Sequence, residues 1–213
     1  MKLCNSRCYI LHKRPFNDRS ILLDLFSPIS GINRVVARIK KQQHLQALYQ
    51  PFQPLVCTWS IKNDLGSLKM IEPTKGFHLL QPKQLFCGFY VNELLLKLLP
   101  SGEPCESIYE AYIIFLNTVN TQTEPALRVF ETQLLEHIGL ALYPPKNDAH
   151  YHLTADGWQK SDDPQAFSSE TIMYIHQQAW DQPNILEEAK RLNRIRIQIA
   201  TDYKELKSKS IFN

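Results

Sequence analysis

Glycine is scarce in this sequence, with seven residues among 213. Loops that cradle phosphate groups need clustered glycines, because their backbone amides must approach the ligand closely. The sequence also lacks Walker-type, G-x-G-x-x-G, G-x-S-x-G and H-E-x-x-H motifs. We therefore predict no catalytic residues and no cofactor, and we expect a protein that binds its partners without being an enzyme.

Long hydrophobic runs are also missing. No apolar stretch reaches the roughly 18 to 20 residues that a membrane-spanning helix needs, and no secretory signal opens the sequence. The five cysteines include one close pair, Cys4 and Cys8, without a second pair to complete a tetrahedral zinc site. We therefore expect a cytoplasmic protein with reduced thiols, no bound metal and no membrane partner.

Charge is distributed unevenly, although the net charge is only +3. Residues 1–75 hold 12 Lys and Arg against 4 Asp and Glu, whereas residues 76–180 hold 5 against 12. A basic first third suits a polyanionic partner, and the alternative is an ordinary solvated surface. The imbalance favours two modules with different partners.

The basic first third has the composition of β-strands. Five short segments are rich in β-branched and aromatic residues, and turn sequences such as SPISG and NDLG separate them. They span residues 8–12, 20–26, 32–39, 55–61 and 67–72. Closing five such strands into a barrel leaves no exposed edges. We predict a five-stranded OB-fold barrel over residues 1–78, with an SH3-like barrel as the alternative.

Helical periodicity replaces the strand pattern after the barrel. Three consecutive helices are predicted to begin near Pro82, Pro104 and Pro125, because a first turn tolerates proline, and Gly139 is predicted to close the third. Residues 143–167 are polar and turn-rich, and we predict an irregular excursion there.

Two more helices are predicted beyond this excursion. A short one covers residues 168–180, and a long one covers residues 184–209 with Asn184 as its N-cap. The long helix carries a basic side opposite its apolar stripe. The predicted fold is therefore α+β, with a C-terminal α-helical domain over residues 79–213.

Cations gather around the third predicted strand. Arg34, Arg38 and Lys40 alternate along it and therefore share one face. DNA phosphates favour such a row through counterion release and hydrogen bonds. We predict that the DNA-binding residues are Lys13, Arg14, Arg19, Arg34, Arg38, Lys40, Lys41 and His44.

Four aromatic residues of the barrel could offer stacking surfaces to unpaired bases: Phe16, Tyr49, Phe52 and Trp59. Core packing is the alternative for each of them. For Phe52, the two flanking prolines favour a structural role at the entry to the fourth strand.

A histidine-rich segment, DAHYHLTADGW, offers the best enzyme-like pattern. Its His150 and His152, with Asp148 and Asp156, suggest a metal-dependent hydrolase as one hypothesis. No cysteine or third histidine follows at ligand spacing, so an exposed polar loop is the competing interpretation.

Five collinear segments resemble the bacterial recombination mediator family RecO: YILHKRPFNDRSILLDLFSPISG, YQPFQPL, FYVNELLLKLLP, EPALRVFETQLLEHIGLAL and ELKSKSIF. The resemblance implies an N-terminal OB-fold and a C-terminal helical domain. It also implies binding to single- and double-stranded DNA and annealing of complementary strands. Implied protein partners are RecR, the C-terminal tail of single-stranded DNA-binding protein and, functionally, the recombinase RecA.

Individual residues follow from the same resemblance. It implies that Arg14, Arg34, Arg38, Lys40 and Lys41 face DNA. It also implies that Arg128 docks the partner tail, since a guanidinium can bind a carboxylate in a bidentate manner. An ion pair of Arg128 with a neighbouring glutamate, at position 124 or 131, is the competing interpretation.

The sequence departs from the family pattern in two places. Many relatives carry a four-cysteine zinc module where this chain has residues 143–167, which contain no cysteine, so no zinc is carried over. The connection after the third strand is less rich in Arg and Gly than is usual in the family.

These observations predict a DNA-binding and strand-annealing recombination mediator, cytoplasmic and associated with the nucleoid. It would help to load recombinase onto single strands coated with their binding protein. The alternative is a protein-interaction adaptor that has a small β-barrel and does not anneal DNA.

Overall fold

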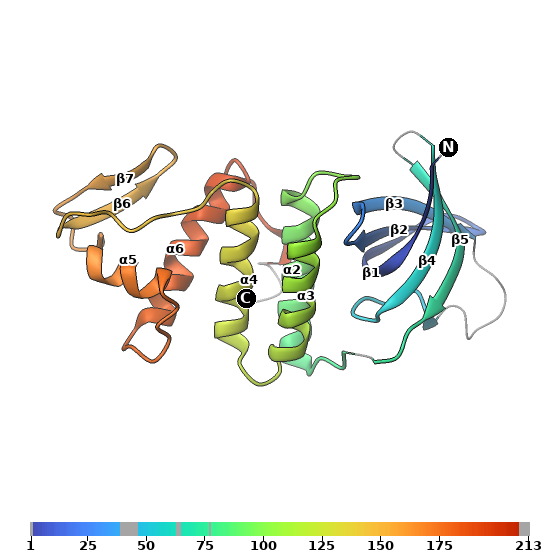
Figure 1. The fold of residues 1–213 in the computed structure, drawn as a ribbon, viewed down its shortest axis with the longest axis horizontal. Coiled ribbons are helices and arrows are strands. Elements are labelled where there is room, and N and C mark those ends of the chain that lie inside the picture. The colour runs from blue at the N-terminus through green and yellow to red at the C-terminus, as the bar shows by residue number, and fades with distance from the viewer. Residues whose placement is uncertain (1, 39–46, 63–64, 77, 209–213) are drawn as a thin grey trace.

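The computed structural model describes residues 2–38, 47–62, 65–76 and 78–208. A β-barrel lies at one end, helices form the middle, and a small sheet lies at the other end (Figure 1). The barrel strands are β1 (Lys2–Asn17), β2 (Ser20–Ser27), β3 (Gly31–Arg38), β4 (Leu55–Lys62) and β5 (Leu65–Pro73). The helices are α2 (Pro82–Leu98), α3 (Glu106–Thr118), α4 (Thr123–His137), α5 (Ser169–His176) and α6 (Ile185–Ala200).

The barrel closes in the order β1-β2-β3-β5-β4. Strand β1 makes this possible because its first half pairs with β4 and its second half pairs with β2. A short parallel pairing completes the ring, with Val35 opposite Gly66. A side chain at Gly66 would lie 2.8 Å from Cγ1 of Val35, so the closure needs glycine. The closed barrel followed by helices confirms the predicted fold, although β1 is much longer than the segment 8–12 that we predicted.

The outer face of strands β1 to β3 packs against the helices at one end. Tyr9 and Phe26 belong to the same buried cluster as Tyr109 and Tyr112 of α3, and the rings of Tyr9 and Tyr112 lie 5.2 Å apart. Asn92 of α2 donates to the carbonyl oxygen of Leu11 at 2.9 Å and accepts from the Tyr112 hydroxyl at 2.7 Å. Buried hydrogen bonds therefore fix the barrel on the helices.

The loop between α2 and α3 adds a second junction. Gly31 has φ +54, and a side chain there would overlap the carbonyl oxygen of Glu103. Beside it, the amide of Gly102 donates to the carbonyl oxygen of Ile32 at 2.9 Å. Only glycine permits this close approach of the β2–β3 turn to the helical domain.

Residues 143–167 differ from the irregular excursion that we predicted. They contain most of a three-stranded sheet of order β7-β6-β8, whose strands are β6 (His150–Thr154), β7 (Gly157–Lys160) and β8 (Phe167–Ser168). Tyr151 and Phe167 of this sheet pack with Ile172 of α5 and Leu192 of α6. Tertiary packing therefore stabilises strands that are too short to give a periodic signal.

The last helix is shorter than the predicted span of 184–209. It ends at Ala200, because Asp202 and Tyr203 adopt positive φ angles of 49° and 60° and turn the chain back. Asn184 occupies the N-cap position as predicted, but its backbone has a positive φ of 62° and its side chain makes no capping hydrogen bond.

Candidate functional site

The predicted basic face is present on strands β1 to β3. Arg34 and Arg38 are exposed, whereas Val35 and Ala37 between them are buried inside the barrel. Strand register places Arg14 opposite Leu22, which in turn lies opposite Val36 on the same outer face. We call the surface formed by Arg14, Arg34 and Arg38 the basic barrel face. Period-two alternation therefore predicted its two β3 arginines correctly.

One of these arginines has an ionic partner that the sequence pattern did not reveal. The Nε of Arg34 donates to Oδ1 of Asp24 at 2.7 Å, and Nδ1 of His12 lies 3.6 Å from Oδ2 of the same carboxylate. Asp24 is buried, whereas 48% of the Arg34 side chain remains exposed. Among the described residues, no carboxylate pairs with Arg14 or Arg38. These two cations are therefore the ones available to a ligand.

The other predicted cations are dispersed. Arg19 is exposed in the turn between β1 and β2, and its backbone amide donates to Asn17 Oδ1 at 3.0 Å. Lys13 is exposed, but in the strand register it lies opposite Leu23, whose side chain points into the barrel core. The side chain of Lys13 therefore leaves β1 on the opposite face of the sheet from that of Arg14. The predictions for Lys40, Lys41 and His44 fall outside the residues that the structure describes.

Three of the four candidate stacking residues are buried. Trp59 is inaccessible within the barrel core, and Tyr49 packs in the same cluster. The ring of Phe52 fills the space left by Gly88 of α2, where a side chain would lie 2.7 Å from that ring. Core packing, the alternative given for each residue, therefore holds for these three, and the structural role favoured for Phe52 is confirmed. Phe16, with 51% of its surface exposed, is the candidate of the four that remains for a base.

The histidine-rich segment forms no metal site in the part of the chain that the structure describes. His152 Nε2 lies 3.3 Å from Asp163, and Asp148 accepts from the Ser169 hydroxyl at 3.0 Å. No group of three His, Cys, Asp or Glu side chains among the described residues could hold a metal ion. Likewise, no helix in the described ranges is long and apolar enough to cross a bilayer.

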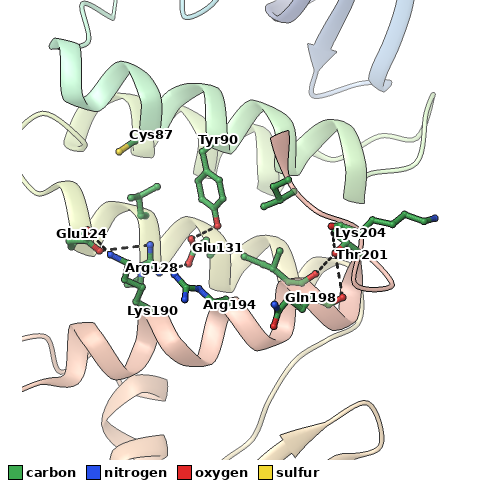
Figure 2. A pocket seen from close by; sticks show the side chains of 13 residues that line it. Cys87, Tyr90, Glu124, Arg128, Glu131, Lys190, Arg194, Gln198, Thr201 and Lys204 are labelled. Carbon is green, nitrogen blue, oxygen red and sulfur yellow. Dashed lines mark hydrogen bonds and ion pairs between the residues drawn. The ribbon is translucent and has the colours of Figure 1, made fainter. Parts of the chain in front are cut away.

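Arg128 lines a groove between α2, α4 and α6 that has a volume of about 620 Å³ (Figure 2). Apolar side chains contribute to its wall, among them Leu127, Ile197 and Leu206. The lining also contains four cations and two carboxylates: Arg128, Lys190, Arg194 and Lys204, with Glu124 and Glu131. We call this the Arg128 groove, and its excess of positive charge suits an acidic peptide with an apolar side chain.

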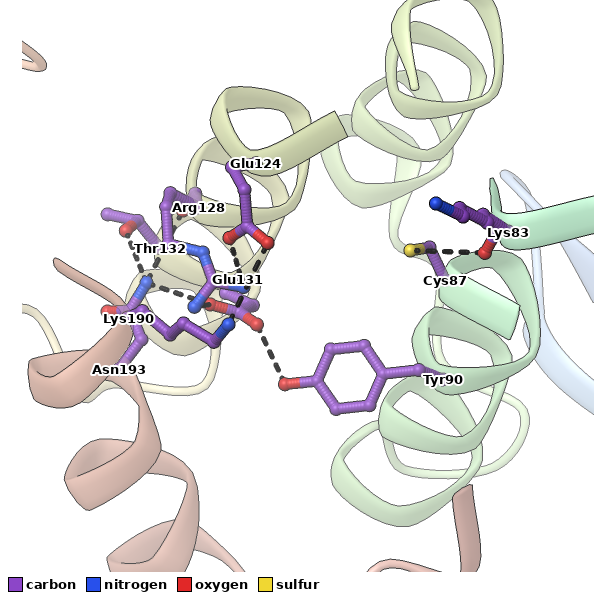
Figure 3. Close-up of polar contacts among 9 residues, drawn as sticks. All are labelled: Lys83, Cys87, Tyr90, Glu124, Arg128, Glu131, Thr132, Lys190 and Asn193. Atoms are coloured by element: carbon purple, nitrogen blue, oxygen red, sulfur yellow. Dashed lines mark hydrogen bonds and ion pairs between the residues drawn. The ribbon is translucent and has the colours of Figure 1, made fainter. Parts of the chain in front are cut away.

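Glu131 holds Arg128 from the buried side of the groove. Its carboxylate accepts from the Tyr90 hydroxyl at 2.7 Å and from Nδ2 of Asn193 at 3.1 Å, and it lies 3.1 Å from Nη1 of Arg128 (Figure 3). Burial raises the pKa of Glu131 above its ordinary value, while the charge of Arg128 opposes that rise. Tyr90 of α2 and Asn193 of α6 therefore fix the Glu131 carboxylate, which in turn holds the Arg128 guanidinium.

The family resemblance pointed to Arg128 but not to the other cations of the groove, and the ion pairs with Glu124 and Glu131 named as the competing interpretation are present. Lys190 and Arg194 lie on the basic side of α6, about 60 residues further along the chain, and Lys204 follows the helix. The sequence did show a basic side on the long amphipathic segment that forms α6. It could not show that this helix packs against α4. The packing of α6 on α4 brings the two sets together (Figure 2).

Comparison with known proteins gives one consistent family. The N-terminal model of recombination protein O matches residues 1–77, and the C-terminal model of the same protein matches residues 79–143. A DNA repair protein RecO from Methylococcus capsulatus is 34% identical over 219 residues, covering 96% of this chain and 90% of that relative. Proteins of the same name from Coxiella burnetii and Pseudoalteromonas translucida are 32% and 31% identical, and at least 95% of each chain is covered.

Proposed function

This chain belongs to the RecO family of recombination and DNA repair proteins, and we propose that it binds single- and double-stranded DNA and anneals complementary strands. The observation that carries the proposal is the basic barrel face, where Arg14 and Arg38 lie exposed and pair with no carboxylate of the described residues. Cations on this face would neutralise phosphates of two strands and lower their mutual repulsion. The protein would act by binding, without catalysing a bond-making reaction.

A salt series with single-stranded DNA tests the phosphate contacts. We expect Arg14→Ala combined with Arg38→Ala to weaken binding and to reduce the slope of log K against log salt by about 1.4, at roughly 0.7 per lost phosphate contact. Lys146→Ala combined with Lys160→Ala is the matched control, because it removes the same charge from exposed positions in the small-sheet region (Figure 1). Equal effects of the two double variants would refute a role of the barrel face.

We further propose that the Arg128 groove binds the acidic and apolar C-terminal tail of single-stranded DNA-binding protein. The groove combines Arg128, Lys190 and Arg194 with the apolar Leu127 and Ile197. Cations suit the carboxylates of the tail, and the apolar wall suits its aromatic side chain. Recruitment through this groove would bring the barrel face to strands that the partner protein already coats.

Arg194→Ala provides the cleaner test of this docking. Arg194 is exposed and, within the described part of the chain, pairs with no carboxylate, whereas the loss of Arg128 would leave the buried Glu131 without its counter-ion. We expect weaker binding of a fluorescently labelled tail peptide in polarisation measurements. Lys160→Ala should leave this binding unchanged, and an effect of the same size in both variants would contradict docking in the groove.

Within this function, RecR and the recombinase RecA would be the further partners, in the cytoplasm and close to the nucleoid. The alternative is an adaptor that binds proteins but does not anneal DNA. The pairing of Arg34 with Asp24 supports that alternative, because it lowers the free charge of the barrel face. Annealing of complementary strands coated with their binding protein distinguishes the two, since an adaptor would not accelerate it.

A further inference from the structure

Glu124 interacts with cations on two of the three helices that form the Arg128 groove, α4 and α6. It lies in the first turn of α4, with Oε2 at 3.9 Å from Nη2 of Arg128 on the same helix. Its other oxygen, Oε1, lies 3.8 Å from Nζ of Lys190 on α6 (Figure 3). One carboxylate therefore faces two of the cations that an acidic ligand would use.

The two carboxylates that face Arg128 hold it very differently. Glu131 is 1% exposed and 3.1 Å from Nη1, with further hydrogen bonds that fix its own position. Glu124 has 46% of its side chain exposed, and both of its ion-pair distances exceed hydrogen-bonding range. Exposed pairs of this kind contribute about 0.2–1 kcal/mol, so Glu124 can be displaced while Glu131 stays.

A displaced Glu124 would keep a favourable environment. Its position in the first turn of α4 places it at the positive end of the helix dipole, where a carboxylate is stabilised in several rotamers. An incoming carboxylate beside Arg128 and Lys190 would repel Glu124 at short range. Rotation of Glu124 toward solvent relieves this repulsion at little cost.

We propose that Glu124 is an internal competitor of the ligand in the Arg128 groove. This inference rests on the proposed docking of an acidic tail and assigns Glu124 a part in its selectivity. In the free protein, Glu124 occupies the cationic end of the groove in place of the ligand carboxylate. Peptides without carboxylates cannot take over its ion pairs with Arg128 and Lys190, so the groove selects for acidic ligands. Glu131 acts as a positioning residue, because it orients Arg128 in both states.

Glu124→Gln tests the proposal, since it keeps the size of the side chain and removes the competing charge. We expect the dissociation constant of the labelled acidic tail peptide to fall by about two- to fivefold, which corresponds to the strength of one exposed ion pair. Glu110→Gln on α3 is the matched control, because it makes the same charge change at an exposed site that does not line the groove. It should change affinity much less.

Two further measurements separate competition from a general charge effect. A peptide whose side-chain and terminal carboxylates are replaced by amides should bind Glu124→Gln no more tightly than the unchanged protein. In a Lys190→Ala background, the gain from Glu124→Gln should shrink, because one of the two released cations is missing.

Different failures identify which proposal is wrong. Unchanged or weaker binding by Glu124→Gln would overturn the competitor role, while docking itself would stand if Arg194→Ala still weakened binding. An equal gain in Glu110→Gln would also overturn it. If neither the unchanged protein nor Glu124→Gln binds the peptide, the docking proposal and the competitor role fail together.

Discussion

The basic barrel face and the Arg128 groove both place an arginine beside a carboxylate, but they use the pair in opposite ways. On the barrel, the acid Asp24 is buried and Arg34 extends outward, with about half of its side chain exposed. In the groove, both Arg128 and Glu131 are buried, and hydrogen bonds from α2 and α6 complete the network. The Arg34 guanidinium is held by Asp24 but remains accessible from solvent, whereas the buried Arg128 suits a single carboxylate at a defined position.

The largest expected effect comes from the buried pair. Arg128→Ala leaves Glu131 without its counter-ion, and we expect the free energy of unfolding to fall by about 3–5 kcal/mol. Arg34→Ala should cost only about 1 kcal/mol, because the guanidinium is half exposed and His12 remains beside Asp24. Urea denaturation of both variants measures the difference, and equal losses would remove the distinction between the two sites.

The junction between the two regions should weaken at high pH. Burial raises the pKa of Tyr9 to about 12, and it also raises the pKa values of Tyr109 and Tyr112. A folded-state pKa above the unfolded value gives stability that is complete below pH 10 and is lost as the pH rises toward 12. For Tyr9 alone this amounts to about 2–3 kcal/mol. Denaturation at pH 8, 10 and 11 should show the loss, and Tyr9→Phe should reduce its steepness.

Gly31 provides a steric test of the same junction. Gly31→Ala should lower the free energy of unfolding by about 2–3 kcal/mol, because the new methyl group meets the Glu103 carbonyl oxygen in addition to the backbone strain. Gly102→Ala is the control, since Gly102 also has a positive φ of 81° but, its chain neighbours aside, no atom of the described residues lies within 4 Å of the added carbon. It should cost only about 1 kcal/mol, and equal costs would mean that the contact relaxes freely.

The smallest expected effect distinguishes Arg34 from Arg38 within the basic barrel face, through the salt dependence of DNA binding. Arg38→Ala should reduce the salt slope for single-stranded DNA by about 0.7, the amount for one phosphate contact. Arg34→Ala should reduce it by less, because Asp24 already holds that guanidinium at 2.7 Å. A larger reduction for Arg34 than for Arg38 would show that the ion pair opens when DNA binds.

The sequence was informative where a short-range repeat decides the structure. Alternation along 32–39 predicted that Arg34 and Arg38 share a face, and helical spacing with prolines near the helix starts predicted α2 to α4. Pro82 and Pro125 lie in first turns, whereas Pro104 precedes α3 and its N-cap, Cys105. It could not reveal Asp24 as the partner of Arg34, since that depends on the register between β2 and β3.

Long-range packing explains why two other features could not be predicted from the sequence, namely the cations that α6 adds to the groove and the small sheet. The cations of α6 reach the Arg128 groove only because that helix packs on α4, a contact between segments far apart in the chain. The sheet of β6, β7 and β8 escaped prediction for a related reason, since Phe167 and Tyr151 gain their stability from α5 and α6. The local amino-acid composition of a segment does not specify which distant segment will pack against it.

Helix α2 is the wall that the barrel and the groove share. Gly88 on one side receives the ring of Phe52, while Tyr90, two residues further on, donates its hydroxyl to Glu131 on the other side. Asn92 then bonds the strand that leads to the basic face. The helix therefore sets a fixed span between the two sites, so that a tail held in the groove would meet DNA on the barrel at a constant distance. Changing that span would require repacking α2 on both of its sides at once.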